Sequence, residues 1–166
     1  MRLLTLLFSF ILITGVIGCA QSDKDTVQTY MNQMKQLNQE NSVIDTIVSK
    51  TDMEGKSGDI IGSHRDPGDD IGNIYRIVDE LDSLNEVVDK PQIPEYYYEM
   101  LISAQDKNSL KTFDIRILVD PDITYIKWID INSSDKKLEG IQINKDYELS
   151  ENLKTDIKQI LNSVSD

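Results

Sequence analysis

Carboxylates that lie beside glycines are the first groups in this chain that could have a chemical role, namely the binding of a metal ion. Residues 51–70 hold four of the eight glycines and the acidic run Asp66–Asp70. Asp59 and a second acidic turn, Asp120–Asp122, supply further oxygens. Calcium takes about six to eight oxygen ligands in such loops. The order of residues matches no calcium-binding motif, so we interpret the run as a solvated turn in which Asp70 caps a following helix.

A histidine with a carboxylate two residues away could form a general base and its orienting group. His64 and Asp66 have this spacing, and His64 is the only histidine of the chain. No Gly-x-Ser-x-Gly motif accompanies them. Neighbouring side chains in a loop seldom point at each other, so we interpret His64 as a lone surface histidine. A site requiring two imidazoles is excluded.

Three consecutive tyrosines, Tyr96–Tyr98, could form an aromatic surface for a glycan or a peptide together with Tyr125 and Trp128 on a nearby strand. On a strand, Tyr97 must face away from both of its neighbours. At most two of the three therefore share a surface. We expect packing in the core and at the sheet edge rather than a binding surface.

Acidic side chains also line the exposed side of a predicted helix over residues 71–89. They are Asp79, Glu80, Asp82, Glu86 and Asp89. A glycosidase needs two carboxylates opposed across a cleft, one of them with a raised pKa. A row of acids along one helix is instead typical of a solvated face. We therefore predict no catalytic residue, no metal site and no cofactor.

The start of the chain has the pattern of an export signal. Arg2 precedes an apolar run that ends at Gly18 and Cys19, and polar residues follow at once. The run is about fifteen residues long, whereas a membrane-spanning helix needs about twenty. Residues 1–18 are thus predicted to be a signal peptide rather than a spanning segment.

The residues Val16–Cys19 resemble the lipobox of bacterial lipoproteins: an aliphatic residue, a second aliphatic or small one, a small one and a cysteine. The resemblance covers the leader alone. It implies a diacylglyceryl group on the Cys19 sulfur, cleavage between Gly18 and Cys19, and a lipid anchor in the cell membrane on its extracytoplasmic side. The alternative is an ordinary secretory signal with a stray cysteine. A chain rich in Asn, Ile, Asp and Lys favours a Gram-positive host.

The composition limits the partners further. The formal net charge is −12, which repels phosphate backbones and makes nucleic acid an unsuitable partner. Cys19 is the only cysteine and is consumed by the anchor. Disulfides, thiol redox chemistry and cysteine-ligated zinc are therefore excluded for the mature domain.

The positions of the apolar residues predict an α+β fold. Helices are expected at 26–49 and 71–89, with the loop 51–70 between them. Strands are expected at 95–105, 111–119, 123–131 and 138–144, and a final helix, capped by Ser150, at 151–164. The predicted architecture has two N-terminal helices, a three- to four-stranded antiparallel meander and a C-terminal helix packed on one face of the sheet. Residues 19–25 form a lipidated tether, and residues 26–166 form one domain.

From these features we expect a membrane-anchored binding or interaction module of the cell envelope, without catalytic activity. Its partner is an unidentified protein or envelope component, and the expected partner surface is the first helix with the 51–70 loop. Two alternatives remain open. One is a metal- or carboxylate-dependent envelope hydrolase, and the other is a scaffold that self-associates through the glutamine-rich first helix.

Overall fold

The chain folds into one antiparallel sheet with helices packed on one of its faces. The computed structural model describes residues 26–36, 42–52, 56, 58–66, 72–87, 89, 92–134 and 141–164. Its strands are β1 Ser42–Asp52, β2 Ile60–Arg65, β3 Tyr96–Asp106, β4 Thr112–Val119, β5 Tyr125–Ser133 and β6 Ile141–Glu148. They lie in the order β2-β1-β3-β4-β5-β6, and every neighbouring pair is antiparallel. The α+β class is thus confirmed, but the predicted three to four strands are wrong because the sheet has six.

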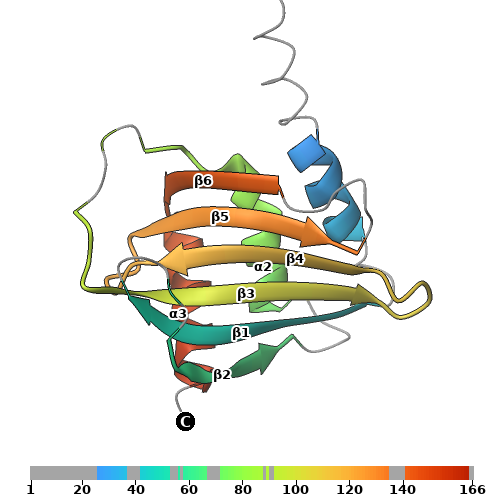
Figure 1. Cartoon of the computed structure of the whole chain (residues 1–166), viewed down its shortest axis with the longest axis horizontal. Helices are drawn as coiled ribbons and strands as arrows, with labels where there is room; N and C mark the ends of the chain where they lie inside the picture. Colours follow the sequence, from blue (N-terminus) through green and yellow to red (C-terminus); the bar gives the residue numbers. More distant parts are fainter. Residues whose placement is uncertain are drawn as a thin grey trace, which may run out of the picture.

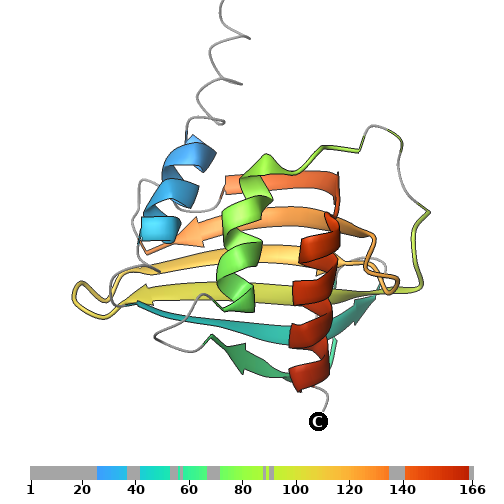
Figure 2. The same ribbon diagram turned by 180° about the vertical axis from the view of Figure 1, so that it is seen from behind.

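Two helices, α2 Asn73–Glu80 and α3 Glu151–Val164, lie across one face of the sheet, and the opposite face carries neither (Figures 1 and 2). Alternate residues of β4 point into the core under them: Phe113, Ile115, Ile117 and Val119 are all nearly inaccessible. Arg76 of α2 joins Asp156 of α3 through a bond of 2.9 Å from Nε to Oδ2. Among the described residues, no helix is long and apolar enough to cross a membrane.

The predicted helix over 26–49 is wrong in its second half. A helix covers residues 26–36, and β1 then occupies Ser42–Asp52. The helix buries Tyr30, Met31 and Met34 completely. The Tyr30 hydroxyl lies 2.7 Å from the carbonyl oxygen of Asp114 and 2.6 Å from that of Asn132. Its apolar side is therefore part of the core and is not available as a partner surface.

The segment 51–70 is not one loop, and its strand is longer than the very short one that the sequence allows at Ile60 and Ile61. Residues 60–65 form strand β2, which pairs with β1 and makes one edge of the sheet. Gly62 is needed there because a Cβ atom at this position would lie 2.7 Å from the backbone oxygen of Val164 in α3. Residues 67–70 lie outside the described part of the chain.

The second helix is shorter than predicted. Helix α2 ends at Glu80, and a 3₁₀ turn, η1 Leu81–Ser83, follows it. Asp66 binds the first amides of α2, and the predicted cap Asp70 lies outside the described residues. The carboxylate of Asp66 accepts bonds of 3.2 Å from the amide of Ile74 and 2.9 Å from that of Tyr75. Gly72 makes room for this carboxylate, since a Cβ there would lie 2.1 Å from Asp66 Cγ.

The final helix agrees with the prediction in both position and capping. It runs Glu151–Val164, and the amide of Leu153 donates a bond of 3.2 Å to the Ser150 hydroxyl. Leu153, Ile157 and Ile160 are fully buried against the sheet. Within the described residues, this two-layer arrangement leaves one broad face of the sheet without a helix (Figures 1 and 2).

Candidate ligand-binding pocket

A pocket of about 410 Å³ lies at one end of the uncovered face. Tyr97, Tyr125, Lys127 and Asp146 contribute to it from three strands. On β5, Tyr125 and Lys127 alternate with Ile126 and Trp128, whose side chains are buried in the core. Lys127 pairs in register with Asp146 of β6, so their side chains are cross-strand neighbours on the same face. We call this site the tyrosine pocket.

One wall of the tyrosine pocket is the β4–β5 turn, residues 120–124, which Asp120 holds in place. Its carboxylate accepts bonds from the amides of Thr124 and Tyr125 at 2.7 and 2.6 Å. It also accepts from the Thr124 hydroxyl at 2.8 Å and the Asp122 amide at 3.2 Å. Ile123 is held at a φ of 55°, a left-handed conformation that is costly for a β-branched residue. The wall is therefore preorganised.

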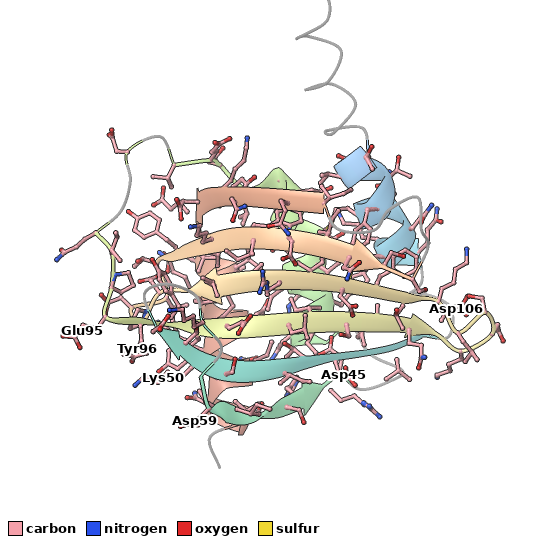
Figure 3. The ribbon with its side chains drawn as sticks, in the orientation of Figure 1. Asp45, Lys50, Asp59, Glu95, Tyr96 and Asp106 are labelled. Carbon is pink, nitrogen blue, oxygen red and sulfur yellow. The ribbon has the colours of Figure 1, made fainter. Side chains whose placement is uncertain are left out.

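The opposite wall is the segment of residues 92–95 that leads into β3. Gln92, Ile93, Pro94 and Glu95 all line the pocket, and Ile93 is 68% exposed. Figure 3 shows Glu95 at one end of β3, with Asp106 at the other end. The pocket is thus built from the three strands β3, β5 and β6, one rigid turn and this exposed segment.

The electrostatics of the tyrosine pocket are acidic. Glu95, Asp120, Asp122 and Asp146 line it together with a single cation, Lys127. Burial raises the pKa of Tyr97, and the nearby Asp146 and Asp120 add to the rise because negative charge opposes formation of a phenolate. Among the described residues, no hydrogen bond or ion pair engages the side chains of Glu95, Asp122, Lys127 or Asp146.

The middle of the same face is different, because its charges are paired with one another. Arg116 of β4 lies 2.7 Å from Asp130 of β5 and 3.7 Å from Glu99 of β3. Ser49 donates to Glu99 at 3.2 Å, and Gln142 donates to Asp130 at 3.3 Å. We call these five residues the paired row. It crosses five strands, and each of its three charged side chains takes part in an ion pair.

The structure separates the aromatic residues that the sequence grouped together. Tyr97 and Tyr125 meet in the tyrosine pocket. Tyr96 and Tyr98 contact each other edge to face with centroids 5.4 Å apart, and Lys50 lies 3.8 Å above the Tyr96 ring (Figure 3). Trp128 is buried in the core, where its indole nitrogen has no partner within the described residues. The expectation of core and edge packing therefore fails for Tyr97 and Tyr125.

The interpretation of His64 as a lone surface residue is also wrong. Its Nδ1 lies 2.8 Å from the Ser163 hydroxyl, and its Nε2 lies 3.6 Å from Asp66. This serine–histidine–aspartate contact is not arranged for nucleophilic attack. The Ser163 hydroxyl donates at 2.8 Å to the carbonyl of Ile160, so its proton points away from the imidazole. Asp66 is occupied with the amides of α2. The three side chains instead connect β2, α2 and α3.

The acidic groups predicted around the second helix are largely engaged in structural contacts. Lys35 lies 3.5 Å from Asp79 and 3.0 Å from Asp82, which ties the first helix to α2 and η1. Glu80 accepts a bond from Ser150, and Glu86 pairs with Lys145 at 2.7 Å. In the part of the chain that the structure describes, no three His, Cys, Asp or Glu residues come close enough together to hold a metal ion.

Other sequence predictions lie outside the described residues. These are the signal peptide 1–18, the cleavage site between Gly18 and Cys19, the lipidated Cys19 and the tether 19–25. No protein-family model, curated protein or solved structure matches the chain.

Sequence reasoning missed three of the groups that line the tyrosine pocket: Glu95, Lys127 and Asp146. Lys127 follows Tyr125 at the two-residue spacing of a strand, so this pair was predictable from the alternation. Asp146 lies beyond the predicted strand 138–144, and its place opposite Lys127 depends on strand register. No local signal in the sequence indicates that register.

Proposed function

We propose that this protein is a lipid-anchored binding module of the bacterial cell envelope, without catalytic activity, that takes its ligand in the tyrosine pocket. The observation that carries the proposal is the contrast in charge pairing on one sheet face. The three charged side chains of the paired row form ion pairs, whereas four charged residues of the pocket form no side-chain hydrogen bond or ion pair within the described residues and lie beside two tyrosines. Unpaired charges in a concave, partly aromatic site are typical of ligand recognition.

Binding is favoured over hydrolysis by the way the candidate catalytic groups are used. Ser163, His64 and Asp66 hold secondary-structure elements together, and the Ser163 proton is already donated to a carbonyl. In the pocket itself, Asp120 is fixed by four hydrogen bonds as the support of its turn. The remaining carboxylates have no neighbouring nucleophile of the serine or cysteine type among the lining residues.

The proposed anchor would keep the domain near the membrane. Seven residue steps separate Cys19 from Thr26, the first described residue of the first helix. This length spans at most about 25 Å. The described start of that helix lies on the β6 side of the sheet, opposite β2 and the C-terminal end (Figures 1 and 2). We therefore expect the β6 edge to lie nearer to the bilayer than the β2 edge.

The anchor is tested by replacing Cys19 with serine and fractionating cells. The proposal expects the variant to leave the membrane fraction and to escape processing at Gly18. A variant that stays in the membrane and is cut as before contradicts the anchor.

The binding site is tested by photo-crosslinking in living cells. The protein is then recovered, and its mass is measured by mass spectrometry. A benzophenone side chain at position 93 lies at the rim of the pocket, and one at position 110 lies on the distant β3–β4 turn. Ile93 and Leu110 are similarly exposed, at 68% and 69%, which makes them a matched pair. We expect a defined added mass from position 93 that is absent from position 110. Identical products from both positions would overturn the proposal.

A further inference from the structure

We infer that the ligand of the tyrosine pocket is an organic cation that carries more than one protonated amine. This inference rests on the proposed function and specifies the chemistry of the ligand. The pocket is lined by two tyrosines, Tyr97 and Tyr125, and by four acidic residues. The chemical class follows from the sign of the charge, the aromatic rings and the size of the cavity.

The charge of the pocket selects the sign of the ligand. Four carboxylates and one ammonium group line it, which gives a formal charge of −3. Asp120 is committed to its turn, yet its negative charge still contributes to the field in the pocket. Within the described residues, Glu95, Asp122 and Asp146 form no side-chain hydrogen bond or ion pair that would compete with a ligand amine. An anion placed there would be repelled, and a single small cation would leave most of the charge uncompensated.

The aromatic rings favour an organic ion over a bare metal ion. The faces of tyrosine rings attract ammonium groups and also pack against the methylene groups between them. A metal ion requires several oxygens converging at about 2.3–2.6 Å for calcium, or closer for magnesium. Within the described residues no group of His, Cys, Asp or Glu side chains converges in that way. A cavity of about 410 Å³ also falls in the usual range for small organic ligands.

Lys127 gives the inference a test whose sign can be predicted. It is the one cation among the lining residues and lies opposite Asp146 without forming an ion pair. If the ligand is cationic, Lys127 opposes it, and Lys127→Gln tightens binding. If the ligand is an anion or a zwitterion that uses Lys127 as a donor, the same substitution weakens binding. The two outcomes have opposite signs.

The experiment is calorimetric titration of the purified full-length protein in a non-ionic detergent, with spermidine as the probe. We expect binding at low salt that weakens as salt is added, because the attraction is partly electrostatic. Asp146→Asn should weaken the affinity about threefold to fivefold, and Lys127→Gln should strengthen it by a similar factor. Tyr125→Ala should weaken it about fivefold because the ring face is lost. Tyr97→Phe, which keeps its ring, should change it little.

Asp59→Asn is the matched control. Asp59 precedes β2 at the other edge of the sheet, is exposed and does not line the pocket, so its replacement removes the same charge from outside the site. Equal weakening by Asp146→Asn and Asp59→Asn would mean that spermidine binds only nonspecifically to the acidic surface, and would overturn the inference. Circular dichroism of each variant separates loss of binding from loss of folding.

Two further probes define the source of the amines and the class of ligand. Trilysine tests amines carried on a peptide, and maltotriose tests a neutral glycan that stacks on tyrosine. Binding of spermidine or trilysine supports the inference, and the tighter of the two identifies a free polyamine or a basic peptide. Binding of maltotriose alone, or of no probe at millimolar concentration, overturns it. The proposed function is judged separately, since a specific crosslink from position 93 would survive either result.

Discussion

The uncovered sheet face contains two groups of charged residues that do opposite things. In the paired row, Arg116 lies between Glu99 and Asp130, and serine and glutamine complete the contacts. At the tyrosine pocket, Lys127 and Asp146 are register partners but form no ion pair in the described structure. The first group links neighbouring strands of the sheet, and we propose that the second binds a ligand. Antiparallel sheets commonly have one face that packs on the core and one that faces solvent. The open face alone therefore does not indicate a function, and the proposal rests on the unpaired charges at one end of it.

The largest expected effect is a loss of stability caused by a substitution in the wall of the pocket. Asp120→Ala removes the acceptor of four hydrogen bonds in the β4–β5 turn. We expect the free energy of unfolding to fall by about 2–3 kcal/mol, measured by urea denaturation. Asp120→Asn keeps one carbonyl oxygen and should lose less. If Asp120→Ala is as stable as the original protein, the wall is not preorganised in the way described.

The next largest effect belongs to the paired row. Arg116→Ala leaves Glu99 and Asp130 facing each other without a cation, and both side chains are mostly buried, at 12% and 19% exposed. The expected loss of stability is about 2 kcal/mol, from a calorimetric melt at neutral pH. Spermidine affinity should remain unchanged. A loss of affinity with unchanged stability would reverse the assignment of the two regions.

Substitutions of the unpaired charges should leave stability almost unchanged. Lys127→Gln and Asp146→Asn remove no hydrogen bond or ion pair within the described residues, so we expect changes within about 0.5 kcal/mol. The same urea titration that measures Arg116→Ala provides the comparison. A destabilisation by Asp146→Asn as large as that by Arg116→Ala would show that the pocket charges are structural too.

The smallest effect is on the titration of one tyrosine. The pKa of Tyr97 is raised by burial and by Asp146 and Asp120, so Asp146→Asn should lower it toward the ordinary value of about 10. Phenolate absorbance, with the signal of Tyr97→Phe subtracted, measures the change, and Asp130→Asn in the paired row should have no effect.

The raised pKa of Tyr97 also means that the folded protein holds this proton more tightly than the unfolded chain. The resulting stabilisation is present below about pH 10 and is lost as the pH rises through the folded pKa.

The regular spacing of apolar residues explains which helices and strands could be predicted from the sequence. Phe113, Ile115 and Ile117 mark β4 unambiguously, and Leu153, Ile157 and Ile160 mark α3. Strand β1 was missed because its pattern is misleading. Thr46 is fully buried although polar, whereas Ile47 is 43% exposed. Ile44, Ile47 and Val48 therefore have helical spacing on a strand.

Strand β2 and the pocket depend on contacts between distant residues. The backbone of Gly62 and the side chain of His64 lie against the end of α3, which no local period could reveal. In β5 a bulge shifts the register between Trp128 and Asp130, so Lys127 and Asp130 share the uncovered face despite their odd spacing. The sequence drew attention to the aromatic residues. Predicting which of them share a face, and which acids lie near Tyr97, would have required the register of the whole sheet.

The most direct test of the central claim is to map spermidine onto the protein by amide chemical shifts. The account predicts concentration-dependent shifts confined to residues 95–97, 120–127 and around Asp146, with the amides beside Arg116 and the first helix unchanged. Shifts centred on the paired row or on the first helix, or no shifts at any concentration up to millimolar, would contradict it.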